Sequence, residues 1–175
     1  ILTVLYLIFT EGYAATRDEA LVRAELCAEA IRLTRLVREL MAPPPSEATA
    51  LLALMLLHDA RRDTRLDDNG DIVLLDAQDR GRWDRTSIME ALPLVETALR
   101  SGPGPFALQA AIAALHCQAP RAEDTDWPQI VQLYELSMRE REVTELLLRG
   151  LAIDEIGRSL AISKHTVRDH TKAIF

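Results

Sequence analysis

The last forty residues, 136–175, constrain the fold most, because their apolar, capping and glycine positions together predict three short helices. Ser137 and Glu140 have the spacing of a capping box, which predicts a helix start at Ser137. An apolar stripe at helical spacing begins at Val143, and Gly150 predicts the end of this helix. The segment therefore begins as an amphipathic helix with a defined stop.

A second short helix is predicted over 154–160, where Gly157 is expected to stand at a close approach of two helices, because it has no side chain. A turn then leads to Ser163, the predicted cap of a third helix. On that helix Val167 is expected to face the core, seven residues before Ile174. The remaining side chains point outward and are mostly polar or basic: Lys164, His165, Arg168, Asp169, Thr171 and Lys172.

The strings SMREREV, LLLRGLAIDEIGRSLAIS and HTVRDHTKAIF resemble the DNA-binding domain of LuxR-type response regulators, a helix-turn-helix. The resemblance implies that the third helix lies in the major groove of double-stranded DNA. The residues that it implies as readers of bases are Arg168, Asp169 and Lys172. The residues expected to contact phosphates are Ser163, Lys164, His165, Thr166 and Thr171.

Two departures from the LuxR pattern carry consequences. Ala152 stands where the family usually has a small polar cap, and the missing cap is expected to cost about 0.5–2 kcal/mol. The family's domain also has a fourth helix, commonly used for dimerisation, and the sequence ends at Phe175 before it. The fold expected is therefore a helix-turn-helix lacking its fourth helix, and a homodimer is kept as one candidate state.

The distribution of charge agrees with a small DNA-contacting tip on an acidic protein. The chain has a net charge of −7, while residues 136–175 hold seven Lys and Arg against six Asp and Glu, a net +1. Residues 1–135 therefore carry −8. Basic residues on and beside the third helix suit attraction to phosphates. The alternative is a solvated helix face that happens to be basic.

Residues 1–135 predict an all-α domain rich in Ala and Leu, divided by proline and glycine breaks. Thr16, Ser46 and Asp126 are the predicted caps of three helices, and Pro43 begins a triple proline that ends the helix before it. Asn69 and Gly70 predict a tight turn in a marginal hairpin. The helix that Thr16 caps is expected to continue to about Met41 and to bury one face, formed by Val22, Leu26, Ala30, Leu33, Val37 and Leu40.

Strings such as LCAEAIRLTRLVREL, LLALMLLHDARR, DIVLLDAQDRGRWDR and EDTDWPQIVQLYE resemble the C-terminal extension of a group of extracytoplasmic-function sigma factors. The resemblance implies tetratricopeptide-like helices, although no clean 34-residue repeat is present. Two domains are predicted, 1–135 and 136–175, joined rigidly or by helix near Glu135. Such a chain is a fusion of a sigma-type extension to a different DNA reader, or a truncated or rearranged gene product.

Other residues allow both a functional and a structural interpretation. His58 with Asp59 and Asp63 could hold a metal, but a structural histidine is favoured, and no metal or other cofactor is expected. The acidic run from Asp67 suits a solvated turn better than a calcium loop. The segment DAQDRGRWDR predicts an ion-pair network that locks the loop, or a partner surface. The residues of that candidate surface are Asp79, Arg80, Arg82, Trp83 and Arg85.

The remaining features limit the class of protein. Cys27 and Cys117 lie far apart in apolar runs, which predicts buried reduced thiols and suits the cytoplasm. No stretch reaches the roughly 20 apolar residues that cross a bilayer, and no activated nucleophile or phosphate loop indicates an enzyme. The preferred hypothesis is a transcription regulator. The alternative is a helical scaffold for RNA polymerase or another regulator, with a vestigial or protein-contacting helix-turn-helix.

Overall fold

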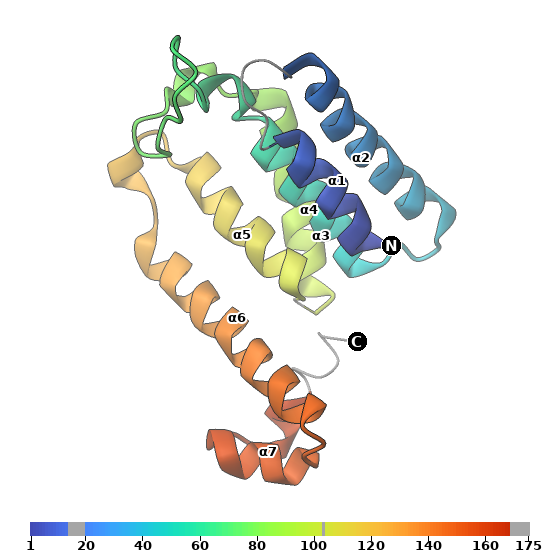
Figure 1. Cartoon of the computed structure of the whole chain (residues 1–175). Coiled ribbons are helices and arrows are strands. Elements are labelled where there is room, and N and C mark those ends of the chain that lie inside the picture. Colours follow the sequence, from blue (N-terminus) through green and yellow to red (C-terminus); the bar gives the residue numbers. More distant parts are fainter. Residues whose placement is uncertain (14–19, 103, 169–175) are drawn as a thin grey trace.

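The computed structural model describes residues 1–13, 20–102 and 104–168, and this part of the chain is helical, without strands (Figure 1). A bundle comes first and is followed by a long helix that leads away from it to a small C-terminal module. The α-helices are α1 (Leu2–Tyr13), α2 (Ala20–Leu40), α3 (Ser46–Asp59), α4 (Arg85–Arg100), α5 (Pro105–Gln118), α6 (Trp127–Leu148) and α7 (Ile153–Leu160). The all-α prediction is confirmed.

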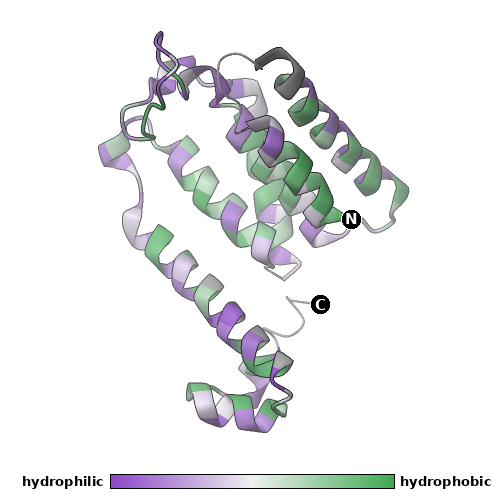
Figure 2. Cartoon of the chain, in the orientation of Figure 1, coloured by the Kyte–Doolittle hydropathy of each residue, from purple (hydrophilic) through white to green (hydrophobic). Residues whose placement is uncertain are grey.

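Helix α3 is the centre of the bundle. Every residue from Ala48 to Leu57 is buried, so this helix is apolar all round and has neighbours on every side. It packs against α1, α2, α4 and α5. Figure 2 shows hydrophobic residues where these helices face one another and hydrophilic residues in the long loop between α3 and α4. The buried residues of the bundle form three neighbouring clusters, and the partly buried Phe106 packs against all of them.

The buried face of helix α2 is narrower than the sequence predicts. Cys27, Ala30 and Thr34 are fully buried, whereas Leu40 is 77% exposed. The prediction that Leu40 lies on the buried face is therefore wrong: its side chain, in the last turn of α2, faces solvent. The side chain of Val22 and the predicted cap at Thr16 lie outside the described residues.

Of the caps predicted before α3 and α6, one is present and one is not. The Asp126 carboxylate accepts the amide of Gln129, as predicted. At α3 the prediction is wrong, because the Ser46 hydroxyl donates to the carbonyl of Ala98, 3.0 Å away. The Asp84 carboxylate caps α4 through the amides of Thr86 and Ser87, at the start that the sequence predicts.

The loop between α3 and α4 contains the predicted tight turn, reduced to a single antiparallel bridge between Leu66 and Ile72. The Asp67 carboxylate accepts the amides of Asn69 and Asp71, both at 2.9 Å. A carboxylate used in this way stabilises the turn itself. The geometry favours the structural interpretation of this acidic run over a calcium loop.

Helix α6 runs without interruption from Trp127 to Leu148, and this continuity corrects the sequence analysis. No helix begins at Ser137, because α6 starts ten residues earlier and no proline or glycine interrupts it. The expected helical junction near Glu135 is present. The end of the helix is as predicted: Gly150 has a φ of +82° and its amide donates to the Leu147 carbonyl.

Candidate DNA-binding surface

The C-terminal module consists of the second half of α6, α7 and a further helical segment at 164–168. Between the last two lies a tight turn in which Ala161 adopts the left-handed conformation, with a φ of 53°. The Ser163 hydroxyl accepts the amide of Thr166 at 3.0 Å, which confirms the predicted cap. Helix, turn and helix therefore follow in the predicted order.

Three fully buried side chains hold the module together. Val143 from α6, Ile156 from α7 and Val167 from the third helical segment each have 0% exposure and form one cluster. Partly buried leucines and isoleucines of α6, α7 and the loop and turn on either side of α7 surround this cluster. The orientation of the third segment is thus fixed by Val167, as the sequence predicts.

Gly157 is required where the turn crosses α7. A Cβ atom at this position would lie 2.9 Å from the carbonyl oxygen of Ile162, closer than real Cβ atoms approach. A close approach is present at Gly157, but it is with the backbone of the turn that precedes the third helical segment, and not between two helices as predicted. It fixes the angle at which this segment leaves α7.

With Val167 turned inward, the opposite side of the third segment faces solvent. Lys164, His165, Thr166 and Arg168 are all exposed. Lys164 also borders a hollow that Arg158 and Asp154 of α7 line, so the surface of the module there carries both signs of charge. The predicted base readers Asp169 and Lys172, and Thr171, lie outside the described residues.

The start of α7 has half of a capping box. Ala152 has extended backbone angles and no side-chain acceptor, so the side-chain cap that the LuxR family usually has here is missing, as expected. The Glu155 carboxylate nevertheless accepts the amide of Ala152 at 2.8 Å. This bond satisfies one amide at the helix start, and the sequence analysis did not include it.

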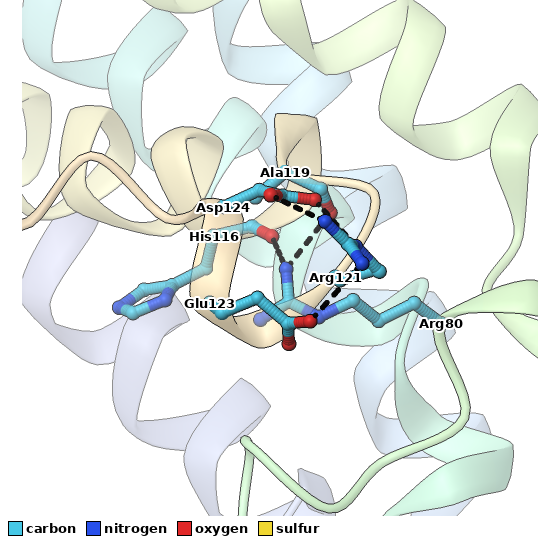
Figure 3. Close-up of polar contacts among 6 residues, drawn as sticks. All are labelled: Arg80, His116, Ala119, Arg121, Glu123 and Asp124. Carbon is cyan, nitrogen blue, oxygen red and sulfur yellow. Dashed lines mark hydrogen bonds and ion pairs between the residues drawn. The ribbon is translucent and has the colours of Figure 1, made fainter.

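The segment around Arg80 and Trp83 is built into the bundle. Arg80 donates to the carbonyls of His116 and Ala119, at 2.5 and 2.9 Å (Figure 3). The Trp83 indole donates to Thr64 at 2.9 Å. Both side chains are buried, whereas Asp79, Arg82 and Arg85 are exposed.

This arrangement fastens the long loop to α5 by hydrogen bonds to backbone carbonyls. The expected ion-pair network is not what holds it: Asp79 accepts the amide of Gly81, and Asp84 caps α4. The Arg80 guanidinium also lies 5.0 Å from the centre of the Trp83 ring. The structure therefore supports the interpretation that this segment holds the loop in place, but through hydrogen bonds to carbonyls rather than through ion pairs.

The histidine and the two thiols fit structural roles. His58 stacks on Tyr13 with ring centres 5.4 Å apart, and burial lowers its pKa to about 3. Cys27 and Cys117 are free and buried, as predicted, and burial raises the pKa of Cys117 to about 11. Across the described residues, no group of three His, Cys, Asp or Glu side chains could hold a metal ion. Nor is any helix there long and apolar enough to span a membrane.

Comparison with known proteins identifies the class of the C-terminal module. Residues 134–175 match the family described as Bacterial regulatory proteins, luxR family. The module is therefore a LuxR-family helix-turn-helix DNA-binding domain. No solved structure matches the chain.

Residues 1–99 match a second family, described as Family of unknown function (DUF6596), and the chain belongs to this family. A relative from Rhizobium meliloti (strain 1021), "Uncharacterized protein R00370", is 44% identical over 163 residues. The match covers 93% of this chain and 36% of the relative, so the chain spans about a third of that protein's length. Because 163 of the 175 residues are matched, the matched segment includes at least residues 13–163 wherever it begins. It therefore includes all of α6.

Proposed function

We propose that the protein is a transcription regulator that binds promoter or operator DNA through the surface at 164–172, with the helical bundle as its regulatory domain. One observation carries this proposal. Val167 is fixed in the core of the module, and this leaves Lys164, His165 and Arg168 exposed on the outer side of the same segment. A recognition helix presents its side chains to a DNA groove in this manner.

The proposal assigns different roles to the exposed side chains. Arg168, Asp169 and Lys172 read base edges, with arginine to guanine as the favoured pairing. Lys164, His165 and Thr166 bind phosphates and so fix the register of the helix on the duplex. Ser163 and Thr171 complete the phosphate contacts.

Selection of duplexes from a random pool tests the proposal, with the whole chain and an Arg168→Ala, Lys172→Ala double variant. The whole chain is expected to enrich one motif, and the double variant to lose it. Arg168→Ala alone should relax discrimination at one position by about 1–3 kcal/mol. Lys164→Ala should weaken all duplexes about equally.

Arg100→Ala is the matched control, because Arg100 is exposed on α4 and pairs there with Glu96. It should bind the selected duplex like the unaltered chain. Equal loss of specific and non-specific binding by Arg168→Ala would contradict a base-reading role. Absence of any enriched motif would contradict the proposal as a whole.

A second candidate function has one observation in its favour. Trp127, Val131, Tyr134 and Met138 follow one face of α6 at helical spacing, and each is more than half exposed. Such a row suits contact with a protein, and the resemblance of residues 1–135 to a sigma-factor extension makes RNA polymerase the candidate partner. Binding to DNA should weaken steeply with salt, whereas apolar docking should not.

A further inference from the structure

We propose that the bundle holds a small carboxylate with an apolar body, in a pocket formed by α3, α5 and α6. The pocket has a volume of about 280 Å³, close to the smaller ligand sites of proteins. Leu54, Leu108 and Ile112 form part of its apolar wall. Arg61 and His116 also line it and supply the polar groups.

Two residues that line the pocket each have a buried side-chain nitrogen without a hydrogen-bond partner in the part of the chain that the structure describes. These atoms are Nε of Arg61 and Nδ1 of His116. Buried polar groups in folded proteins almost always have a partner, and an orphaned one calls for an explanation such as a bound molecule. A carboxylate in the pocket would accept from the guanidinium of Arg61, which lines it.

The charge in the pocket points to an anion. Arg61 is always protonated, and it belongs to none of the ion pairs found among the described residues. Burial, followed by Arg61 and Arg65, lowers the pKa of His58, and burial lowers that of His116. Both imidazoles are therefore neutral at pH 7, and Arg61 is the cation of this site.

A neighbouring pocket shares His116 but does not suit an anion. It has a volume of about 330 Å³ and is lined by Asp76 and Arg80. One terminal nitrogen of Arg80 already donates to the two carbonyls described above, although its Nε lacks a partner as that of Arg61 does. The Asp76 carboxylate would repel a second negative charge. The site with Arg61 is the better match for a carboxylate.

A ligand in this pocket would contact the helix that joins the two parts of the chain. Tyr134 of α6 lines the pocket, and the same helix contributes Val143 to the core of the DNA-binding module. The inference therefore gives the regulatory domain of the proposed function a class of ligand. The binding itself does not depend on whether the chain reads DNA.

The test is calorimetric titration of the whole chain at pH 7 with octanoate, an eight-carbon carboxylate. Octan-1-ol and octylammonium are the matched probes, which keep the apolar body and change the head group. Octanoate is expected to bind once per chain, at least tenfold more tightly than octan-1-ol, with no binding of octylammonium. Because DNA is absent, failure of this test is distinguishable from failure of the proposed function.

Variants then locate the site. Arg61→Gln should weaken octanoate at least tenfold, and Ala113→Met should weaken it similarly by narrowing the pocket that Ala113 lines. Arg100→Gln, far along α4, should bind octanoate like the unaltered chain. Circular dichroism checks folding, and Ala113→Met decides the test if Arg61→Gln unfolds, since Arg61 also lies 5.8 Å from the Trp83 ring centre.

Two results would overturn the inference. If octan-1-ol binds as tightly as octanoate, the pocket recognises only the apolar body. If the folded Arg61 and Ala113 variants both bind octanoate with unchanged affinity, the carboxylate binds elsewhere.

Discussion

The two halves of α6 lie against cores of very different size. Near its start, Ile130 is buried beside a bundle in which α3 alone has ten consecutive buried residues, 48–57. Near its end, Val143 forms a cluster with two other fully buried side chains among the described residues, Ile156 and Val167. The bundle can lose one side chain and keep most of its core, whereas the module cannot.

This difference suits the two regions to different roles. A small core buries a smaller share of its surface and leaves more of its residues available for contact with other molecules. The module compensates with local devices: the Ser163 cap, the Gly150 stop and the Glu155 bond to Ala152. The bundle instead depends on packing between distant segments.

The largest expected effect comes from removing one member of the small core. Ile156→Ala should destabilise the module by about 2–5 kcal/mol, because it removes a fully buried side chain and leaves a cavity. We expect local unfolding of the module and loss of DNA binding, while the bundle keeps its structure. Amide hydrogen exchange measured region by region would show the loss of protection confined to residues after Glu135.

Leu57→Ala is the matched variant in the bundle, because Leu57 is also fully buried. Leu57→Ala should lower the free energy of unfolding by a similar amount. The amides of both regions should nevertheless stay protected from hydrogen exchange at 25 °C. If Ile156→Ala lowers protection in the bundle as much as in the module, the two regions unfold as one unit and the comparison fails.

The module was largely predictable from sequence because its signals are local. The Ser163 hydroxyl accepts the amide of Thr166, three residues away. Gly150 ends α6, whose last turn lies directly before it. Val167 follows from helical periodicity alone. The predicted start at Ser137 failed for a reason of the same kind: a capping pattern starts a helix only where the preceding chain is not already helical.

The bundle was predictable as a set of helices but not as a packed structure. Ser46 bonds to a carbonyl 52 positions further along the chain, and Arg80 bonds to carbonyls 36 and 39 positions away. No spacing rule connects such residues. The pocket at Arg61 and His116 has the same origin, since three separate helices bring its walls together.

The next effect concerns pH and separates the bundle from the module. Burial holds the folded pKa of His58 at about 3 against an ordinary value of 6.5, so the folded state binds the proton less readily than the unfolded state. His58 is neutral in both states above pH 6.5, and stability falls as pH drops below that value towards the folded pKa. Between pH 7 and 5 the loss should be about 2 kcal/mol.

Chemical denaturation of the whole chain at pH 7, 6 and 5 measures this loss, with His58→Phe as the comparison. Phenylalanine keeps a ring against Tyr13 and carries no proton, so most of the slope in this interval should disappear. An unchanged slope in His58→Phe would mean that another group causes the pH dependence.

The smallest effect is a gain of stability in the module. Ala161 has a φ of 53°, a left-handed conformation that disfavours residues with a Cβ atom. Glycine adopts it without strain, so Ala161→Gly should stabilise the module by about 0.5–1 kcal/mol after its larger loss of chain entropy. Gly157→Ala, four positions earlier, should act in the opposite direction, because its Cβ would meet the Ile162 carbonyl. Hydrogen exchange of residues 143–168 would resolve both changes. A destabilising Ala161→Gly would show that this turn relies on the alanine side chain rather than on its backbone.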